Sequence, residues 1–265
     1  MKSNTLTPFE LFGNQVRYTV PLFQRPYVWN EKDQWGPLWE DVRTVAERIL
    51  ENKEAQASGG KPTQAVPHFL GAIVLDQKMV PTGLIQERHV IDGQQRLTTL
   101  QLLMDAAQEI VAEWGSDADA SALGSLVLNN ISQVAFSDQV FKVWPTNYDR
   151  DAFRAAMSNE TEVTGDLEKS RIVAAHTFFR KEVKDWAEVT GDPDKAALRL
   201  NALVLALSQY LHIVVIDLEE GDNAQVIFET LNHRGTPLLA ADLIKNFVFR
   251  KAERDRLRPQ QATAH

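Results

Sequence analysis

Hydrophobic residues along the chain form short extended runs and longer segments with helical spacing. The short runs predict β-strands at 16–20, 68–76, 85–91, 139–144 and 211–218. Apolar residues three and four positions apart predict helices at 37–52, 93–114, 119–130, 148–157, 167–189, 193–209, 222–231 and 239–255. A stretch rich in small and polar residues at 52–66 predicts a surface loop. This order predicts an α+β fold, with a small sheet core at 1–92, completed by 211–218, and a mostly helical region at 93–265.

The segment HVIDGQQRLTTL places a glycine turn between a predicted strand and the start of a predicted helix. Asp92 and Gly93 end the apolar run, and Gln94, Gln95 and Arg96 open the helix. The first N–H groups of a helix lack intrahelical partners and lie at the positive end of its dipole. Arg96 can meet a phosphate through two parallel hydrogen bonds, and Gly93 lets a ligand approach the backbone. The pattern is typical of an anion site.

A simpler interpretation of the same residues is that Asp92 caps the helix and the glutamines are solvated. On spacing alone this interpretation is the stronger, because a single glycine turn is a weak motif.

Two further polar patches lie at junctions between predicted elements. Gln24 and Arg25 lie on a segment that the following proline keeps extended, and Asn232 and Arg234 lie in a predicted loop. If the three patches converge, three arginines surround one anionic ligand. If an aspartate also binds a magnesium ion or its bound water, such a site could perform phosphoryl transfer.

Composition narrows the classes of protein that the chain can represent. Of the 265 residues, 44% are hydrophobic and 24% are charged, as in an ordinary globular protein. The net charge of -8 argues against a generally basic nucleic-acid binder, although a local basic surface stays open. The absence of cysteine excludes disulfides, zinc–thiolate sites and thiol catalysis. The first residues lack a signal-peptide core and no apolar run reaches membrane-spanning length, so we expect a cytoplasmic protein without membrane contact.

The histidines and aromatic residues offer less specific signals. No phosphate-loop, zinc-helix or His-Asn-His nuclease motif is present. His176 lies in an apolar stretch and is expected in the core rather than as a ligand, so no protein metal site is predicted. Trp35 and Trp39 are expected in the core. Phe23 and Tyr27 are either core residues or part of a pocket that stacks on bases and senses DNA.

The chain resembles the N-terminal domain of GmrSD-type modification-dependent restriction proteins, which include the SspE type of phosphorothioate-based phage defence. Four segments carry the resemblance: PLFQRPYVW at 21–29, HFLGAIVLD at 68–76, HVIDGQQRLTTLQLLMDA at 89–106 and IFETLNHRGTPLLAADLIKNFVF at 227–249.

The resemblance implies a ParB/sulfiredoxin-like core and hydrolysis of GTP or another nucleoside triphosphate, with GTP often preferred. Mg²⁺ is a possible cofactor of this hydrolysis. Carried over by position, the catalytic residues are Asp92, Gln95 and Arg96. The nucleotide-binding residues are Gln24, Arg25, Gly93, Gln94, Asn232 and Arg234. Residues expected to sense the DNA modification are Phe23, Gln24 and Tyr27.

The resemblance also implies partners: modified double-stranded DNA, a His-Asn-His nuclease on a C-terminal domain or a separate chain, and a possible second copy in a homo-oligomer. No nuclease cluster lies in these residues, so we expect no DNA cleavage from this chain alone. Phosphorothioate is the favoured modification and glucosylated hydroxymethylcytosine the alternative. Two other functions stay open: a nucleotide- or DNA-binding switch that does not hydrolyse, and a ParB-like protein-interaction scaffold.

Overall fold

The computed structural model describes residues 2–22, 24–61, 66–78, 85–158, 165–219 and 222. The strands are β1 (Lys2–Leu6), β2 (Val16–Thr19), β3 (His68–Gln77), β4 (Gln86–Asp92), β5 (Val143–Trp144) and β6 (Leu211–Leu218). The α-helices are α1 (Pro8–Phe12), α2 (Gly36–Ala57), α3 (Gln94–Trp114), α4 (Asp117–Val127), α5 (Arg150–Met157), α6 (Arg171–Glu188) and α7 (Pro193–Leu205). Short π-helices η1 (Glu31–Trp35) and η5 (Ala206–Tyr210) flank α2 and α7, and the 3-10 helices are η2 (Ile131–Gln133), η3 (Ser137–Val140) and η4 (Gly165–Lys169).

The six strands form one mixed sheet in the order β1-β6-β3-β4-β2-β5. β6 pairs antiparallel with β1 and parallel with β3, so the late strand lies inside the sheet. β4 is antiparallel to β3 and parallel to β2, while β5 pairs with β2 at the edge. The predicted α+β class is confirmed, and Leu211–Leu218 lies between β1 and β3 in the sheet.

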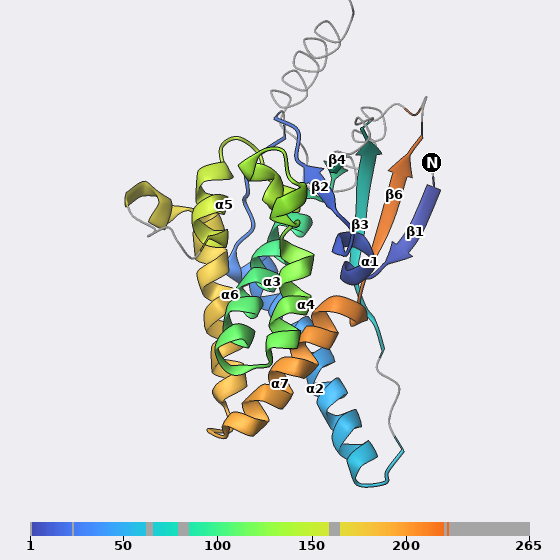
Figure 1. The fold of residues 1–265 in the computed structure, drawn as a ribbon, viewed down its shortest axis with the longest axis vertical. Coiled ribbons are helices and arrows are strands. Elements are labelled where there is room, and N and C mark those ends of the chain that lie inside the picture. Colours follow the sequence, from blue (N-terminus) through green and yellow to red (C-terminus); the bar gives the residue numbers. More distant parts are fainter. Residues whose placement is uncertain are drawn as a thin grey trace, which may run out of the picture.

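Helix α3 is the centre of the helical layer that lies beside the sheet (Figure 1). It contacts α4, α5, α6 and α7, and also β5. Burial extends around the whole helix rather than along one apolar stripe, since Thr98, Thr99, Gln101 and Asp105 are buried as well. A helix buried on all sides needs neighbours on all sides, which the other helices provide.

Alternating residues of the strands face two hydrophobic clusters. Ile73, Leu75 and Val90 belong to the main core, whereas Val74 and Ile91 form a small cluster with Leu218. Adjacent strand residues point to opposite faces, so these clusters lie on the two sides of the sheet. The main core contains residues from Leu11 to Val215. The two regions on either side of the predicted division at residue 92 therefore share one core.

Several element boundaries differ from those predicted. The sequence pattern misses β1 and α1, α2 continues into the predicted 52–66 loop as far as Ala57, and only Val143–Trp144 of the predicted 139–144 strand is extended. The predicted elements from 223 onward lie outside the described residues. Among the described helices, none has the length and apolar character needed to cross a membrane.

Gly93 joins β4 to α3 in a conformation that only glycine adopts easily. Its φ is +91°, and a Cβ placed there would lie 2.5 Å from Ile73 Cγ2 on the neighbouring strand. We therefore expect Gly93→Ala to lower the free energy of unfolding by about 2 kcal/mol or more, from left-handed strain and overpacking. Urea denaturation measures this.

The matched control is Gly124→Ala within α4, where nothing lies within 4 Å of an added Cβ. Alanine there should stabilise the protein by about 0.5–1 kcal/mol, because it favours the helix. Equal stability of the two variants would contradict the assigned role of Gly93.

The buried side chain of Lys142 links the stability of the fold to pH. Lys142 is fully buried, and its Nζ donates to Asn14 O at 2.8 Å and to Asn129 Oδ1 at 3.1 Å. Burial lowers the pKa of Lys142 to about 8. The folded state therefore disfavours the charged lysine, and this cost decreases as the pH rises from the folded pKa toward the higher pKa of the unfolded chain.

Between about pH 8 and 10 the unfolded chain binds more protons at Lys142 than the folded chain, since an unfolded lysine keeps a pKa near 10.4. We expect the unfolding free energy of the wild type, relative to Lys142→Met, to rise by about 1–2 kcal/mol from pH 7.5 to 9.5. Urea denaturation of both proteins at each pH provides the measurement. A difference that does not change with pH would show that Lys142 is not the linked group.

Candidate functional site

The turn at residues 92–96 leaves the start of α3 open. Gly93 is the N-cap residue, and no side-chain hydrogen bond caps the helix in the described part of the chain. The first backbone bond runs from Leu97 N to Gly93 O at 3.0 Å. The alternative interpretation, in which Asp92 caps α3, is therefore not what the structure shows. The preceding N–H groups, those of Gln94, Gln95 and Arg96, are left at the positive end of a 21-residue helix.

Arg96 extends from this first turn along β3. Its Nη1 donates to Ala72 O at 2.6 Å, and a Cβ at Gly71, whose φ is +92°, would lie 3.0 Å from its Nη2. Glycine at position 71 thus makes room for the guanidinium. Burial lowers the pKa of Arg96, and the carboxylate of Asp92 acts in the opposite direction. The guanidinium is fixed in place and only partly solvated, which strengthens its attraction for an anion.

A groove of about 210 Å³ lies along the first two turns of α3, between the start of α2 and β3. Its polar lining comes from Gln34, Asp41, His68 and Arg96, and its apolar lining includes Trp29, Leu38 and Phe69. His68 Nε2 lies 3.3 Å from Asp41 Oδ2, which pairs two of the polar groups. Arg96 therefore lies beside a hollow of the surface, as a ligand-binding arginine must.

Gln24 lies against the end of β4, so the first two predicted patches meet. Its Nε2 donates to Val90 O at 2.7 Å and to Ile91 O at 3.0 Å. Its Oε1 is buried and has no hydrogen-bond partner among the described residues. Buried acceptors are rarely left unpaired, so this oxygen is a candidate for a bond to a ligand or to water. Arg25, the next residue, is exposed.

Gln95 fastens the segment that follows Gln24 to α3. Its Oε1 accepts from Val28 N at 2.8 Å and its Nε2 donates to Pro26 O at 3.0 Å. Because both ends of the amide are occupied and the side chain is buried, Gln95 holds the 26–28 segment against α3 rather than projecting into the groove.

Tyr27 and the two tryptophans belong to the core. The Tyr27 hydroxyl lies 2.6 Å from Thr99 Oγ1 and accepts a hydrogen bond from Trp35 Nε1 at 2.9 Å. Burial raises the pKa of Tyr27. Trp35 and Trp39 are buried, as expected. Tyr27 is only 6% exposed, so it supports the site from within instead of forming an open aromatic wall.

Sequence reasoning missed two side chains that hold the same segment. Asp149 Oδ2 accepts from Tyr27 N at 3.0 Å and from Thr146 Oγ1 at 2.7 Å, and burial raises the pKa of Asp149. Arg171, at the start of α6, donates to Val28 O. Both come from parts of the chain more than 100 residues away, and no local pattern marks them.

Three of the predicted site residues, Phe23, Asn232 and Arg234, lie outside the described residues. The convergence of the third patch with the first two therefore stays a prediction.

Residues 9–249 match the family model described as the N-terminal domain of the GmrSD restriction endonuclease. No curated protein matches the sequence. The match covers both polar patches of the described site and the predicted third patch.

The amide of Gln95 gives a direct test of the described site. Gln95→Ala removes both bonds to the 26–28 backbone, so we expect a loss of about 1–3 kcal/mol in unfolding free energy. The amide of Val28 should also exchange with deuterium faster, because its acceptor is gone.

Gln94→Ala is the matched control, because the described residues make no hydrogen bond with the Gln94 side chain and this residue lies on the same helical turn. Its stability and Val28 exchange should resemble those of the wild type. Unchanged exchange of the Val28 amide in Gln95→Ala would show that Gln95 does not hold the 26–28 backbone.

Proposed function

Because the chain belongs to the family of GmrSD restriction endonuclease N-terminal domains, we propose that it is the nucleotide-hydrolysing sensor of its restriction system. The family acts in modification-dependent restriction of DNA. In our proposal the domain hydrolyses a nucleoside triphosphate, preferably GTP, recognises a modified DNA, and controls a His-Asn-His nuclease domain or chain. We further propose that its sheet is of the ParB/sulfiredoxin-like type.

The observation that carries the proposal is the uncapped start of α3 beside a fixed arginine. The N–H groups at Gln94 and Gln95 provide donors for phosphate oxygens, and Arg96 provides a full positive charge at the groove. Catalysis of phosphoryl transfer consists mainly of positioning and charge stabilisation, which preorganised donors of this kind supply.

The size of the groove suggests how a nucleotide would lie. A volume of about 210 Å³ is below the roughly 300–1,000 Å³ usual for whole-ligand pockets, so the groove would take the phosphate end. Trp29 lines it, and Phe69 is 60% exposed there, which leaves an aromatic face for the base. Arg25 would add a mobile charge from the side of Gln24.

Each remaining site residue has a role in this proposal. Asp92 would orient the attacking water, or hold Mg²⁺ together with the nucleotide's own phosphates, since Mg²⁺ is commonly bound by one carboxylate plus phosphates. Gln95 acts as a positioning residue that keeps the 26–28 segment against α3. Asn232 and Arg234 would complete the phosphate contacts.

For DNA we propose phosphorothioate as the modification, with glucosylated hydroxymethylcytosine as the alternative. Sulfur is larger and less strongly hydrated than oxygen, so a pocket with an aromatic wall and an amide would favour it. Phe23 and the buried, unpaired Oε1 of Gln24 are the proposed contacts. Tyr27 would act indirectly, by fixing the segment that carries them.

The catalytic assignment is tested by Arg96→Gln in a phosphate-release assay with all four nucleoside triphosphates, with plain, phosphorothioated and glucosylated duplexes. We expect the wild type to hydrolyse GTP best and Arg96→Gln to lose about hundredfold or more in kcat, the usual cost of removing a preorganised donor. Arg154→Gln, which removes an arginine paired with Asp138, is the matched control and should keep wild-type turnover.

Two outcomes would contradict the proposal. If wild-type protein binds nucleotide without releasing phosphate under any of these conditions, the domain is a binding switch. If calorimetry detects neither nucleotide nor DNA binding, it is a scaffold for protein partners. Circular dichroism of each variant confirms that loss of turnover does not reflect unfolding.

A further inference from the structure

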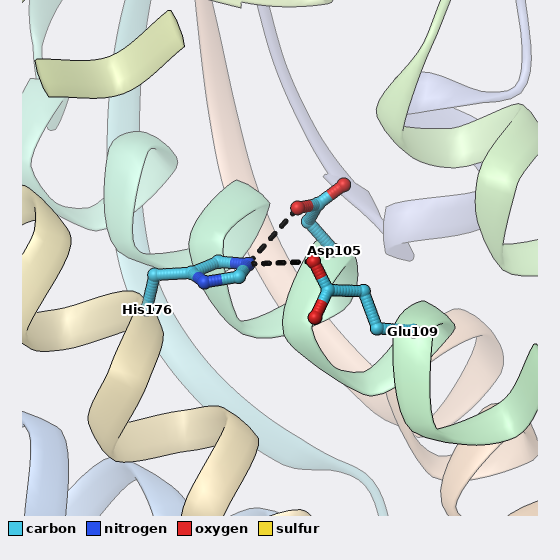
Figure 2. A group of neighbouring side chains, drawn as sticks. All are labelled: Asp105, Glu109 and His176. Atoms are coloured by element: carbon cyan, nitrogen blue, oxygen red, sulfur yellow. Dashed lines mark hydrogen bonds and ion pairs between the residues drawn. The ribbon is translucent and has the colours of Figure 1, made fainter. Parts of the chain in front are cut away.

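Asp105, Glu109 and His176 form a cluster in the middle of the helical layer, away from the start of α3. Asp105 and Glu109 are four residues apart on one face of α3, and His176 projects from α6 toward both (Figure 2). His176 Nε2 lies 3.0 Å from Asp105 Oδ2 and 3.9 Å from Glu109 Oε1. One ligand atom from each residue lies within 4.8 Å of the other two.

These separations suit three ligands of one small cation. Nitrogen and carboxylate ligands lie about 2.0–2.2 Å from Zn²⁺, so two ligands of a tetrahedral ion are about 3.4 Å apart. The two distances from His176 Nε2 lie on either side of that value. The third pair of ligand atoms also lies within 4.8 Å, so side-chain adjustments could bring all three groups around one cation.

The oxygen of Glu109 that faces the cluster is available for such an ion. Arg180 Nε donates to Glu109 Oε2 at 2.7 Å, which fixes the carboxylate and directs Oε1 toward His176. No described residue donates a hydrogen bond to Glu109 Oε1. A ligand carboxylate held by an outer hydrogen bond is the arrangement typical of protein metal sites.

The charge of the cluster also favours a cation. Asp105 and His176 are each 7% exposed, and among the described residues the two carboxylates face one guanidinium, that of Arg180. Burial raises the pKa of Asp105, while the hydrogen bond from His176 acts in the opposite direction. A divalent ion would compensate the buried negative charge more fully than a histidine does.

We infer that Asp105, Glu109 and His176 form a binding site for one divalent first-row transition metal ion that bridges α3 and α6. The imidazole ligand favours Zn²⁺ over Mg²⁺ and Ca²⁺, which prefer oxygen ligands alone. The remaining coordination position would be taken by water, since the carboxylates keep about a tenth of their side-chain surface exposed. The ion would lock α3 to α6, the helix that packs most extensively against it.

The test is a titration of the chelator-treated full chain with Zn²⁺. Calorimetry measures binding, and thermal unfolding measures the change in Tm. We expect one high-affinity site, and a rise in Tm of about 5 °C at a hundredfold excess over Kd, because the ion binds only the folded state. Mg²⁺ at the same concentration should give no shift. Binding of Co²⁺ should produce the visible absorption bands of a protein-bound ion.

The variants are His176→Gln, which can keep the hydrogen bond to Asp105, and Glu109→Gln, which keeps the shape of the side chain. Each should weaken Zn²⁺ binding by more than the 10–100-fold typical of losing an outer-shell partner. The matched control is His68→Gln, which removes a histidine paired with one carboxylate, and it should bind Zn²⁺ as the wild type does. Metal-free unfolding of each variant establishes that it is folded.

Absence of Zn²⁺ binding by the wild type, or equal binding by wild type and both cluster variants, would overturn the proposal and leave the cluster as a histidine–carboxylate hydrogen bond between helices. This outcome is independent of nucleotide hydrolysis, because the titration is made without nucleotide or DNA.

Discussion

The architecture of the site depends on how one extended segment satisfies its backbone hydrogen bonds without a strand beside it. In the segment from Pro26 to Val28, Tyr27 is buried and Val28 is half-buried, and each backbone polar group buried there without a partner would cost about 1–3 kcal/mol. Side chains of Gln95, Asp149 and Arg171 supply the partners. Three helices are thereby tied to one stretch of backbone, and Gln24 is held at the end of β4.

This arrangement explains why the polar residues near Gly93 need not all act on a ligand. Gln95 is adjacent to Arg96 in the sequence, yet its amide is engaged with backbone while the arginine lines a groove. On a helix, neighbouring residues point in directions about 100° apart, so consecutive polar residues divide between structure and surface. The motif therefore combines a residue that holds the backbone in place, Gln95, with a charged residue that lines the groove, Arg96.

Much of the fold could be predicted from periodicity. The apolar spacing of α3, the β-branched run of β6 and the strand-turn-helix order at Gly93 are local signals, and the structure contains all three. β1 could not be predicted, because its residues are polar and it becomes a strand only by pairing with β6. The convergence of the polar patches was a hypothesis from the sequence, and the structure brings Gln24 to the end of β4, next to the 92–96 patch. Asp149, Arg171 and the buried Lys142 carried no signal, since their partners are distant in the chain.

The position of β6 has a consequence for folding during synthesis. β6 lies between β1 and β3 in the sheet, but it follows β3 by about 130 residues in the chain. Until Leu211–Leu218 leaves the ribosome, each has an open edge that can pair with another chain. Completion of the sheet is thus a late, long-range event of the kind that slows folding. Nascent chains would gain from a chaperone that shields these edges during synthesis.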